Sequence, residues 1–158
     1  TGGFTEVLLR LNAKMIYAVD VGYGELHYKL RNNPKITVIE RTNARYLTTE
    51  QITLPPDLIV CDASFISLTT VLTTPIKLAK EKCSLIALIK PQFEVAKEEV
   101  GVGGIIRDPI LHQRVCDEVQ QWLESNHNFK IIGIIPSPIL GAKGNKEFLI
   151  YGQRKSKI

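Results

Sequence analysis

Four ionisable residues occupy the same kind of position in this chain, directly after a short run of apolar residues. They are Asp20, Glu40, Asp62 and Lys90. Short continuous apolar runs are typical of parallel strands that are buried on both faces. In open α/β sheets, ligands bind outside the carboxyl ends of the strands. We therefore expect three carboxylates and one ammonium to line one edge of a sheet, where they form a working site.

Asp62 and Lys90 are the strongest candidates in this set for a catalytic pair, because the apolar runs that they end are neighbours in the sequence. A carboxylate beside a lysine holds the ammonium charged and oriented, whereas a partly desolvated lysine can lose its proton and act as a base. A purely structural ion pair at the edge of a sheet is the alternative. Glu147 directly precedes a later apolar run, and taken alone it is an ordinary surface acid.

Asp20 is a candidate for binding the two hydroxyls of a ribose. This is the usual role of an acid at the end of a strand that follows a glycine turn and a helix. Gly2 and Gly3 stand before such a helix, and they would let the backbone approach a ligand closely. A solvated turn over residues 20–24 is the alternative for Asp20, and the sequence contains no G-x-G-x-x-G fingerprint.

The spacing of apolar residues predicts the elements that position these side chains. Apolar residues at helical spacing predict helices over residues 4–11, 26–31, 67–82 and from Pro109 onward, and Pro75 should kink or divide the third. Asp108 and Pro109 are typical of an N-cap followed by proline at the first helical position. Strands are expected at residues 15–19, 36–39, 58–61, 85–89, 131–135 and 148–151.

The alternation of these elements predicts an α/β fold with a mostly parallel, open sheet and helices on both faces. The last two strands lack a full helix between them, so we expect them to form an antiparallel pair at the edge. Residues 92–107 hold three glycines and no steady period, which indicates a long loop. Thr1 begins as if a strand had just preceded it, so we expect the first strand of the sheet to lie outside this sequence.

Composition limits the class of protein. The chain of 158 residues is expected to form one domain, 1–158, and its 20 basic and 16 acidic residues give a net charge of +4. This mild excess is compatible with a polyanionic partner, and residues 154–157 are expected to form a disordered basic tail. The three cysteines match neither a metal motif nor a disulfide framework, which favours a cytoplasmic protein. No run is apolar enough to span a membrane.

Several catalytic classes lack their signature in the sequence. It contains no H-E-x-x-H and no Cys/His cluster, so we expect no metal site. Neither a G-x-S-x-G elbow nor a P-loop lysine motif is present, which argues against a serine hydrolase and against an NTPase of that type.

Beyond these patterns, the chain resembles the hemolysin-A (TlyA) family, whose fuller glycine motif is D-x-G-S-S-T-G-G-F-T. The resemblance extends over essentially the whole chain, and its motifs are specific. The segments that carry it are TGGFT at 1–5, YAVDVG at 17–22, ERTNAR at 40–45, CDASFISL at 61–68, LIKPQFE at 88–94, GIIRDP at 104–109 and GNKEFL at 144–149.

This resemblance implies an FtsJ-like, Rossmann-like methyltransferase fold that uses S-adenosylmethionine to methylate the 2′-hydroxyl of ribose in ribosomal RNA. The family's catalytic Lys-Asp-Lys-Glu set would place Asp62, Lys90 and Glu147 here. Its first lysine and an S4-type RNA-binding domain lie upstream of the glycine motif, outside this sequence. The residues expected to hold the cofactor are Gly2, Gly3, Asp20, Val21, Asn43 and Asp62.

Contact with ribosomal RNA or a ribosomal subunit is expected from two loops that should rim the site. Their basic residues are Lys97, Arg107, Lys143 and Lys146. Each taken singly is an ordinary solvated side chain, but together they could grip phosphates around a flipped-out nucleotide. The glycine-rich residues 101–104 are expected to form a mobile lid over the site.

Two other functions stay open at this point. A nicotinamide-dependent oxidoreductase also uses a glycine turn and a strand-end acid, although it would not call for the set of Asp62, Lys90 and Glu147. A hemolysin-like or RNA-binding protein without catalysis is the second alternative, and no amphipathic membrane segment supports the hemolytic version.

Overall fold

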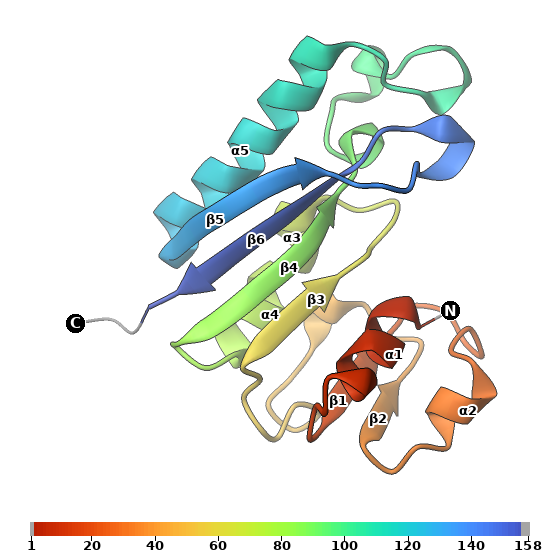
Figure 1. Ribbon diagram of the computed structural model, residues 1–158, viewed down its shortest axis with the longest axis vertical. Coiled ribbons are helices and arrows are strands. Elements are labelled where there is room, and N and C mark those ends of the chain that lie inside the picture. The colour runs from red at the N-terminus through yellow and green to blue at the C-terminus, as the bar shows by residue number, and fades with distance from the viewer. Residues whose placement is uncertain (1, 156–158) are drawn as a thin grey trace. The chain divides into compact units, whose positions relative to one another are not determined.

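The structure, a computed structural model, describes residues 2–155 and resolves two compact units, Thr1–Leu54 and Pro55–Ile158. The first unit contains a two-stranded parallel sheet, and the second contains a mixed sheet of four strands (Figure 1). Every strand predicted from the apolar runs is present, with end points that differ by at most three residues from the expected ones.

The first unit alternates helices and strands, as the periodicity predicts. Its elements are α1 (Gly3–Arg10), β1 (Ile16–Val19), α2 (Tyr28–Arg31), β2 (Ile36–Ile39) and a 3₁₀ turn at Ala44–Tyr46. β1 and β2 pair in parallel with Ile16 opposite Ile36, so Asp20 and Glu40 both follow the same end of this small sheet. The Glu40 carboxylate forms an ion pair with Arg31 of α2.

Gly2 is required by the packing at the start of α1. It has a φ of 95°, in the left-handed region that favours glycine. A Cβ at this position would lie 2.6 Å from a methyl group of Leu26 and 2.7 Å from one of Leu30. The glycine therefore lets the beginning of α1 lie directly against α2 and the segment before it.

The second unit is built on β3 (Leu58–Cys61), β4 (Cys83–Ile89), β5 (Phe129–Pro136) and β6 (Phe148–Arg154), in the order β3-β4-β6-β5. β3 and β4 are parallel, whereas β6 is antiparallel to both β4 and β5. Three strands thus share one direction and β6 alone runs against them, which confirms the expected antiparallel pair at the edge.

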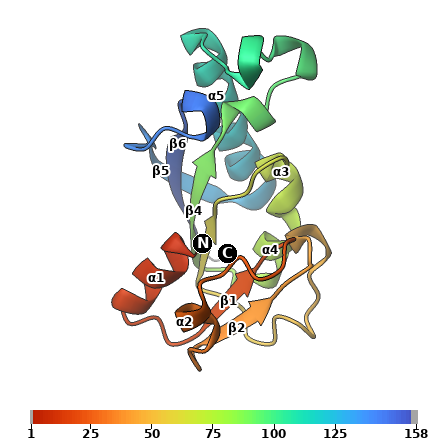
Figure 2. The ribbon, with the colours of Figure 1, turned by 90° about the vertical axis from the view of Figure 1, so that its right-hand side faces the viewer.

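Helices α3 (Leu68–Val71), α4 (Thr73–Leu78) and α5 (Pro109–His127) lie on one face of this sheet (Figures 1 and 2). The core between them is apolar, because alternate residues of β4 are buried and meet the buried side of α5. Fully buried members include Ile76, Leu85, Ile89, Leu123 and Ile150. The expectation of helices on both faces of one sheet stays a prediction.

Two details of the helices are instructive. Asp108 caps α5 as predicted, because its carboxylate accepts a hydrogen bond of 2.9 Å from the N–H of Ile110. The division of the expected helix 67–82, however, falls at Leu72 and not at Pro75. Pro75 lies in the first turn of α4, where its missing N–H removes no hydrogen bond within that helix. Its ring would clash with a backbone carbonyl of the preceding turn, so α3 and α4 cannot form one continuous helix.

The long loop after β4 is confirmed as a segment without α-helix or strand. It contains short 3₁₀ turns at Pro91–Phe93, Lys97–Glu99 and Val102–Gly104. Gly103 and Gly104 have φ values of 77° and 78°, which explains why glycine is needed there. Whether residues 101–104 move as a lid stays a prediction.

Arg154 was expected in a disordered tail, and this expectation is wrong. It is the last residue of β6, and its guanidinium donates hydrogen bonds to the carbonyls of Ile76 (3.1 Å), Lys80 (2.8 Å) and Glu81 (2.8 Å). The carbonyls at the end of a helix have no partner within the helix, so a fork of guanidinium donors stabilises the end of α4. Residues 156 and 157 of the expected tail lie outside the described residues.

Arg154→Met should therefore lower the free energy of unfolding by about 1–3 kcal/mol, because it leaves several carbonyl groups without their donor. Urea denaturation of the variant measures this loss. The neighbouring change Lys155→Met removes an equal charge at an exposed position and should alter stability by less than about 0.5 kcal/mol. Equal losses in the two variants would show that the carbonyl contacts contribute nothing.

Candidate functional site

Asp62 and Lys90 meet just beyond the carboxyl ends of β3 and β4. The two strands are parallel neighbours, with Cys61 opposite Ala87, so the residues that follow them emerge at the same edge. The Lys90 Nζ lies 2.5 Å from Oδ1 of Asp62. Because only 11% of the Lys90 side chain is exposed, this charge is largely withdrawn from water and depends on its partners.

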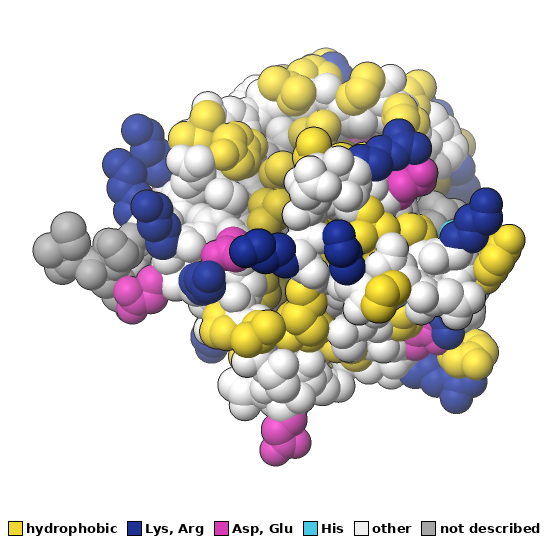
Figure 3. Space-filling view, turned by 60° about the horizontal axis from the view of Figure 1, so that its bottom comes forward, with side chains coloured by type: hydrophobic (Ala, Val, Ile, Leu, Met, Phe, Trp, Pro, Cys, Tyr) yellow, Lys and Arg dark blue, Asp and Glu magenta, His cyan; other side chains and the backbone are white. Residues whose placement is uncertain are grey.

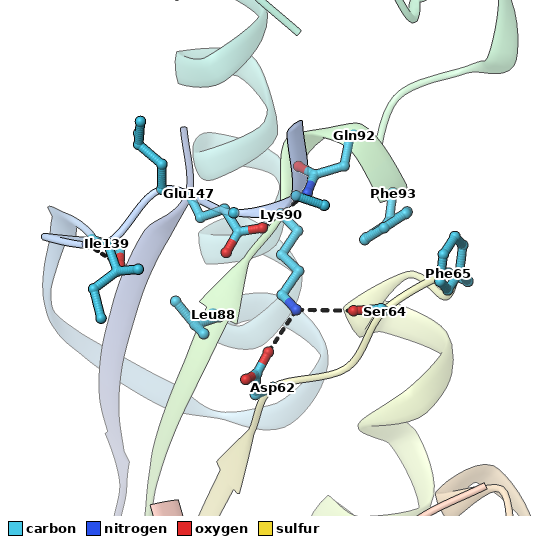
Figure 4. Close-up of a pocket in the computed structure, with 13 residues that line it drawn as sticks. Asp62, Ser64, Phe65, Leu88, Lys90, Gln92, Phe93, Ile139 and Glu147 are labelled. Carbon is cyan, nitrogen blue, oxygen red and sulfur yellow. Dashed lines mark hydrogen bonds and ion pairs between the residues drawn. The ribbon is translucent and has the colours of Figure 1, made fainter. Parts of the chain in front are cut away.

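Ser64 is a second partner of Lys90. Its Oγ accepts a hydrogen bond of 3.0 Å from the Lys90 Nζ, from a position two residues after Asp62 (Figure 4). The loop after β3 thus supplies two acceptors to one ammonium, which has three N–H groups. One N–H direction is left for another group.

Glu147 lies at the same edge of the sheet as Asp62 and Lys90, although it precedes its strand instead of following it. β6 is antiparallel to β4 with Phe148 opposite Ile89, so the residue before β6 lies beside the residue after β4. Glu147 is buried, with 6% of its surface exposed, and its Oε2 accepts a hydrogen bond of 2.8 Å from Nε2 of Gln92. Within residues 2–155, Glu147 is thus held by Gln92, while Lys90 is held by Asp62 and Ser64.

These groups line one cavity of about 350 Å³ (Figure 4). Leu88, Phe93, Ile139 and the exposed Phe65 give the cavity an apolar side, and the rings of Phe65 and Phe93 lie 4.9 Å apart. A cavity with an apolar wall and a few convergent polar groups is the usual form of a small-molecule site. The three residues expected to carry the chemistry are therefore brought together.

Glu94 anchors the loop that carries Asp62 and Ser64. Its carboxylate accepts hydrogen bonds from Oγ of Ser67 (2.7 Å) and from the N–H of Leu68 (2.8 Å), at the start of α3. Burial raises the pKa of the Glu94 carboxyl above its ordinary value, and these two hydrogen bonds oppose that shift only in part. The segment after β4 is thus fastened to the segment after β3 at the edge of the site.

Asn145 fastens the two loops that rim the site. Its side chain is 2% exposed, accepts a hydrogen bond from the N–H of Ile106 (2.9 Å), and donates to the carbonyls of Gly104 (2.9 Å) and Ala142 (3.0 Å). The loop after β4 and the loop before β6 therefore hold each other through one fully bonded side chain.

The four basic residues expected at this rim are exposed, and two of them have partners. Arg107 donates to the carbonyl of Val102 at 3.1 Å, and the Lys146 ammonium lies 5.5 Å from the centre of the Phe148 ring. Lys143 lies in the loop before β6 and Lys97 in the loop after β4. Their side chains remain open to solvent.

With this geometry in place, comparison with known proteins identifies the family. The model of the family described as FtsJ-like methyltransferase matches residues 1–154. The chain belongs to the FtsJ-like methyltransferase family. It is 46% identical over 151 residues to the 16S/23S rRNA (cytidine-2′-O)-methyltransferase TlyA of Mycobacterium tuberculosis, and the match covers 96% of this chain and 56% of that protein.

Solved structures agree with this assignment. A candidate hemolysin of Lactococcus lactis superposes with a TM-score of 0.92 at 39% identity, covering 99% of this chain and 75% of that one. The N-methyltransferase NodS of Bradyrhizobium japonicum superposes with a TM-score of 0.59 at 14% identity, covering 98% of this chain and 81% of that one. The latter supports the Rossmann-like methyltransferase fold. The chain spans only about half the length of the mycobacterial relative.

The residues expected to hold a cofactor in this FtsJ-like chain lie in the first unit, apart from Asp62. Oδ1 of Asp20 accepts a hydrogen bond of 2.9 Å from the N–H of Gly22, and Oδ1 of Asn43 accepts one of 3.0 Å from the N–H of Arg45. Val21 is 69% exposed, and a Cβ on Gly3 would meet no atom within 4 Å. Both polar side chains thus stabilise local turns, and each keeps a second polar atom for a ligand.

Three contributors to the FtsJ-like site were missed from the sequence. Ser64, Gln92 and Gly141 contact Lys90 or Glu147, yet none of them was given a role from the sequence. A signal was available for Ser64 and Gln92, because both lie in segments that carry the family resemblance and each follows an expected site residue by two positions. Gly141 lies six residues before Glu147, and its contact with that carboxylate depends on the folding of the loop.

Other features of the described residues concern metals and membranes. Residues 2–155 contain no group of three or more His, Cys, Asp or Glu side chains placed to hold a metal ion. Within the same residues, no helix combines the length and apolarity needed to cross a membrane. Cys61, Cys83 and Cys116 are buried free thiols.

Glu94 gives the FtsJ-like unit a measurable dependence on pH. A carboxyl whose pKa is raised by folding contributes most to stability at pH values below its ordinary pKa. That contribution is lost as pH rises through the raised pKa. Wild-type protein should therefore lose stability relative to Glu94→Gln as pH rises through this window. Urea unfolding at a series of pH values measures the difference.

The test is how the stability difference between wild type and Glu94→Gln changes with pH. Its absolute size is not informative, because the glutamine amide also alters one of the hydrogen bonds to Ser67 and Leu68 at every pH. Glu124→Gln, at an exposed position of α5, gives the baseline for the same chemical change. A difference between wild type and Glu94→Gln that is as flat as this baseline would contradict the prediction.

Proposed function

We propose that this chain is the catalytic domain of an S-adenosylmethionine-dependent methyltransferase that modifies the 2′-hydroxyl of ribose in ribosomal RNA. The observation that carries the proposal is the convergence of Asp62, Lys90 and Glu147 on one cavity at the carboxyl ends of β3 and β4. The name of the mycobacterial relative, an rRNA (cytidine-2′-O)-methyltransferase, supports the choice of substrate.

Lys90 is the group proposed to act on the ribose hydroxyl, which is a poor nucleophile while it keeps its proton. Asp62 and Ser64 occupy two directions around the Lys90 Nζ, so the remaining direction is available to the hydroxyl. As an ammonium, Lys90 would donate a hydrogen bond in that direction and lower the pKa of the hydroxyl. As a neutral amine, after first releasing one proton to solvent, it would take the hydroxyl proton instead. Glu147 would orient the hydroxyl in either case. General-base assistance of this kind contributes about 10²–10⁴-fold to rate.

S-adenosylmethionine would supply a methyl group on a cationic sulfonium. The residues proposed to hold it are Gly2, Gly3, Asp20, Val21, Asn43 and Asp62, and their chemistry fits. Asp20 has a second carboxylate oxygen for ribose hydroxyls, and Asn43 has amide hydrogens for an adenine ring. Holding donor and acceptor in line supplies much of the acceleration, because it converts a bimolecular step into a unimolecular one.

The proposed RNA contacts are the exposed basic residues Lys97, Arg107, Lys143 and Lys146 on the two rim loops. Asn145 joins these loops by hydrogen bonds at Gly104 and Ile106, close in the sequence to Arg107, and is itself flanked by Lys143 and Lys146. On the molecular face drawn in Figure 3, lysine and arginine side chains are scattered in small groups among apolar and neutral surface. Contacts to phosphates from a few such side chains position an RNA without reading its sequence.

Lys90→Ala in the full-length protein should reduce methyl transfer to ribosomal RNA by at least about 100-fold, because it removes the proposed base. Transfer of labelled methyl from S-adenosylmethionine to isolated ribosomal subunits measures this loss. Calorimetry should show that binding of S-adenosylhomocysteine is kept and that NAD does not bind. Lys82→Ala, at an exposed position, is the matched control. Full activity of Lys90→Ala would refute the proposal.

The double change Lys143→Glu and Lys146→Glu should weaken RNA binding most strongly at low salt. Removing phosphate contacts lowers the dependence of log K on log salt by about one for each lysine. Filter binding to ribosomal RNA over a salt series measures both quantities. Lys77→Glu with Lys82→Glu makes the same change of charge elsewhere in the second unit, and an equal effect there would show that the rim has no special role.

A further inference from the structure

The Glu147 carboxylate is in contact with two groups that no assigned role explains. Nε2 of Gln92 donates a hydrogen bond of 2.8 Å to Oε2. The backbone of Gly141 also lies against the carboxylate, and a Cβ there would overlap it, closest to Oε2. The acid therefore occupies the space that any side chain at position 141 would need.

Gly141 cannot easily move away to make room. Its N–H donates a hydrogen bond of 2.7 Å to the carbonyl of Asn145, whose buried side chain joins both rim loops. Its φ of −82° is open to every residue type, so glycine is not needed there for backbone conformation. The absence of a side chain at position 141 is instead explained by the place of the carboxylate.

Gln92 carries an energetic cost that its bond to Glu147 explains. Its Oε1 is buried and has no hydrogen-bond partner among residues 2–155. A buried unpaired acceptor costs about 1–3 kcal/mol, and packing alone gives no reason to retain an amide at this position. Reversing the amide would turn Oε1 toward the carboxylate and place two acceptors against each other. The observed orientation is therefore dictated by Glu147.

We propose that Gln92 and Gly141 are positioning residues that hold the Glu147 carboxylate in one orientation, with Oε2 bound by the amide and Oε1 free for the cavity. This inference rests on the proposed function, in which Glu147 orients the ribose hydroxyl. A group that is fixed before the substrate arrives needs no reorganisation during the reaction. A neutral amide fixes the acid without adding a second cation beside Lys90.

Two variants of the full-length protein test the proposal through different atoms. Gln92→Met removes the donor and keeps the length of the side chain, whereas Gly141→Ala displaces the carboxylate and leaves Gln92 in place. Each should lower kcat for methyl transfer to ribosomal subunits by about 10–100-fold, because small misplacements of reacting groups have effects of this size. KM for S-adenosylmethionine should stay within about twofold, since the cofactor does not depend on Glu147.

Matched controls exist in the same unit. Gln113 also donates an amide N–H to a carboxylate, that of Asp117 at 2.8 Å, but on the exposed surface of α5. Gly133 lies in β5, and a Cβ there would meet no atom within 4 Å. Gln113→Met and Gly133→Ala should both keep the wild-type kcat.

Gln92→Glu provides a readout that a merely structural role would not produce. At high pH two carboxylates would face each other, whereas at lower pH a shared proton restores a hydrogen bond between them. The ratio of the kcat of this variant to that of wild type should therefore rise as pH falls. A ratio that does not change with pH would contradict the proposal, even if Gln92→Met failed to fold.

Lys90→Ala separates the two levels of inference. If it is inactive while Gln92→Met and Gly141→Ala keep the wild-type kcat, the positioning role is overturned and the proposed function stands. If Lys90→Ala is itself fully active, the proposed function fails before the positioning of Glu147 becomes relevant.

Discussion

The contact between Lys90 and Asp62 is the interaction on which the site depends. An ammonium with 11% of its side chain exposed is costly without a partner, since withdrawing an ion from water costs several kcal/mol. The partner is supplied by strand order, because parallel neighbours deliver the residues that follow them to one edge of the sheet. Placing β6 on the other side of β4, in the reverse direction, then brings Glu147 to that edge as well.

Of the four strand-end residues expected at one edge of a sheet, Asp62 and Lys90 meet as predicted, whereas Asp20 and Glu40 follow strands of the separate two-stranded sheet. Asp62 and Lys90 follow apolar runs, and the rule that ligands bind beyond the carboxyl ends of such strands needs no contact information. Glu147 was different, because it precedes its strand. Its place at the same edge required β6 to be antiparallel and next to β4, and only the resemblance to a family indicated that role beforehand.

Contacts between distant segments are what the sequence could not predict. Arg154 belongs to a basic stretch that is typical of a disordered tail, but three carbonyl groups at the end of α4 and beyond hold it in β6. The division of the helix predicted over 67–82 is different, because it follows from the local effect of Pro75. Its ring excludes a continuous helix through the preceding turn, so the break falls at Leu72. For Arg154, the tertiary neighbours decided the outcome.

The charges inside the cavity and on its rim have opposite formal signs, and this division suits the proposed chemistry. Two carboxylates and one ammonium leave the cavity with one formal negative charge, which would attract a cationic sulfonium and repel phosphate groups. The basic side chains lie on the rim loops, where phosphates of an RNA can approach them. A ribose between its phosphates could then enter the cavity while its charged neighbours stay outside. The hydrogen bond from the neutral amide of Gln92 to Glu147 preserves this division of charge, whereas a lysine at position 92 would cancel the negative charge of the cavity.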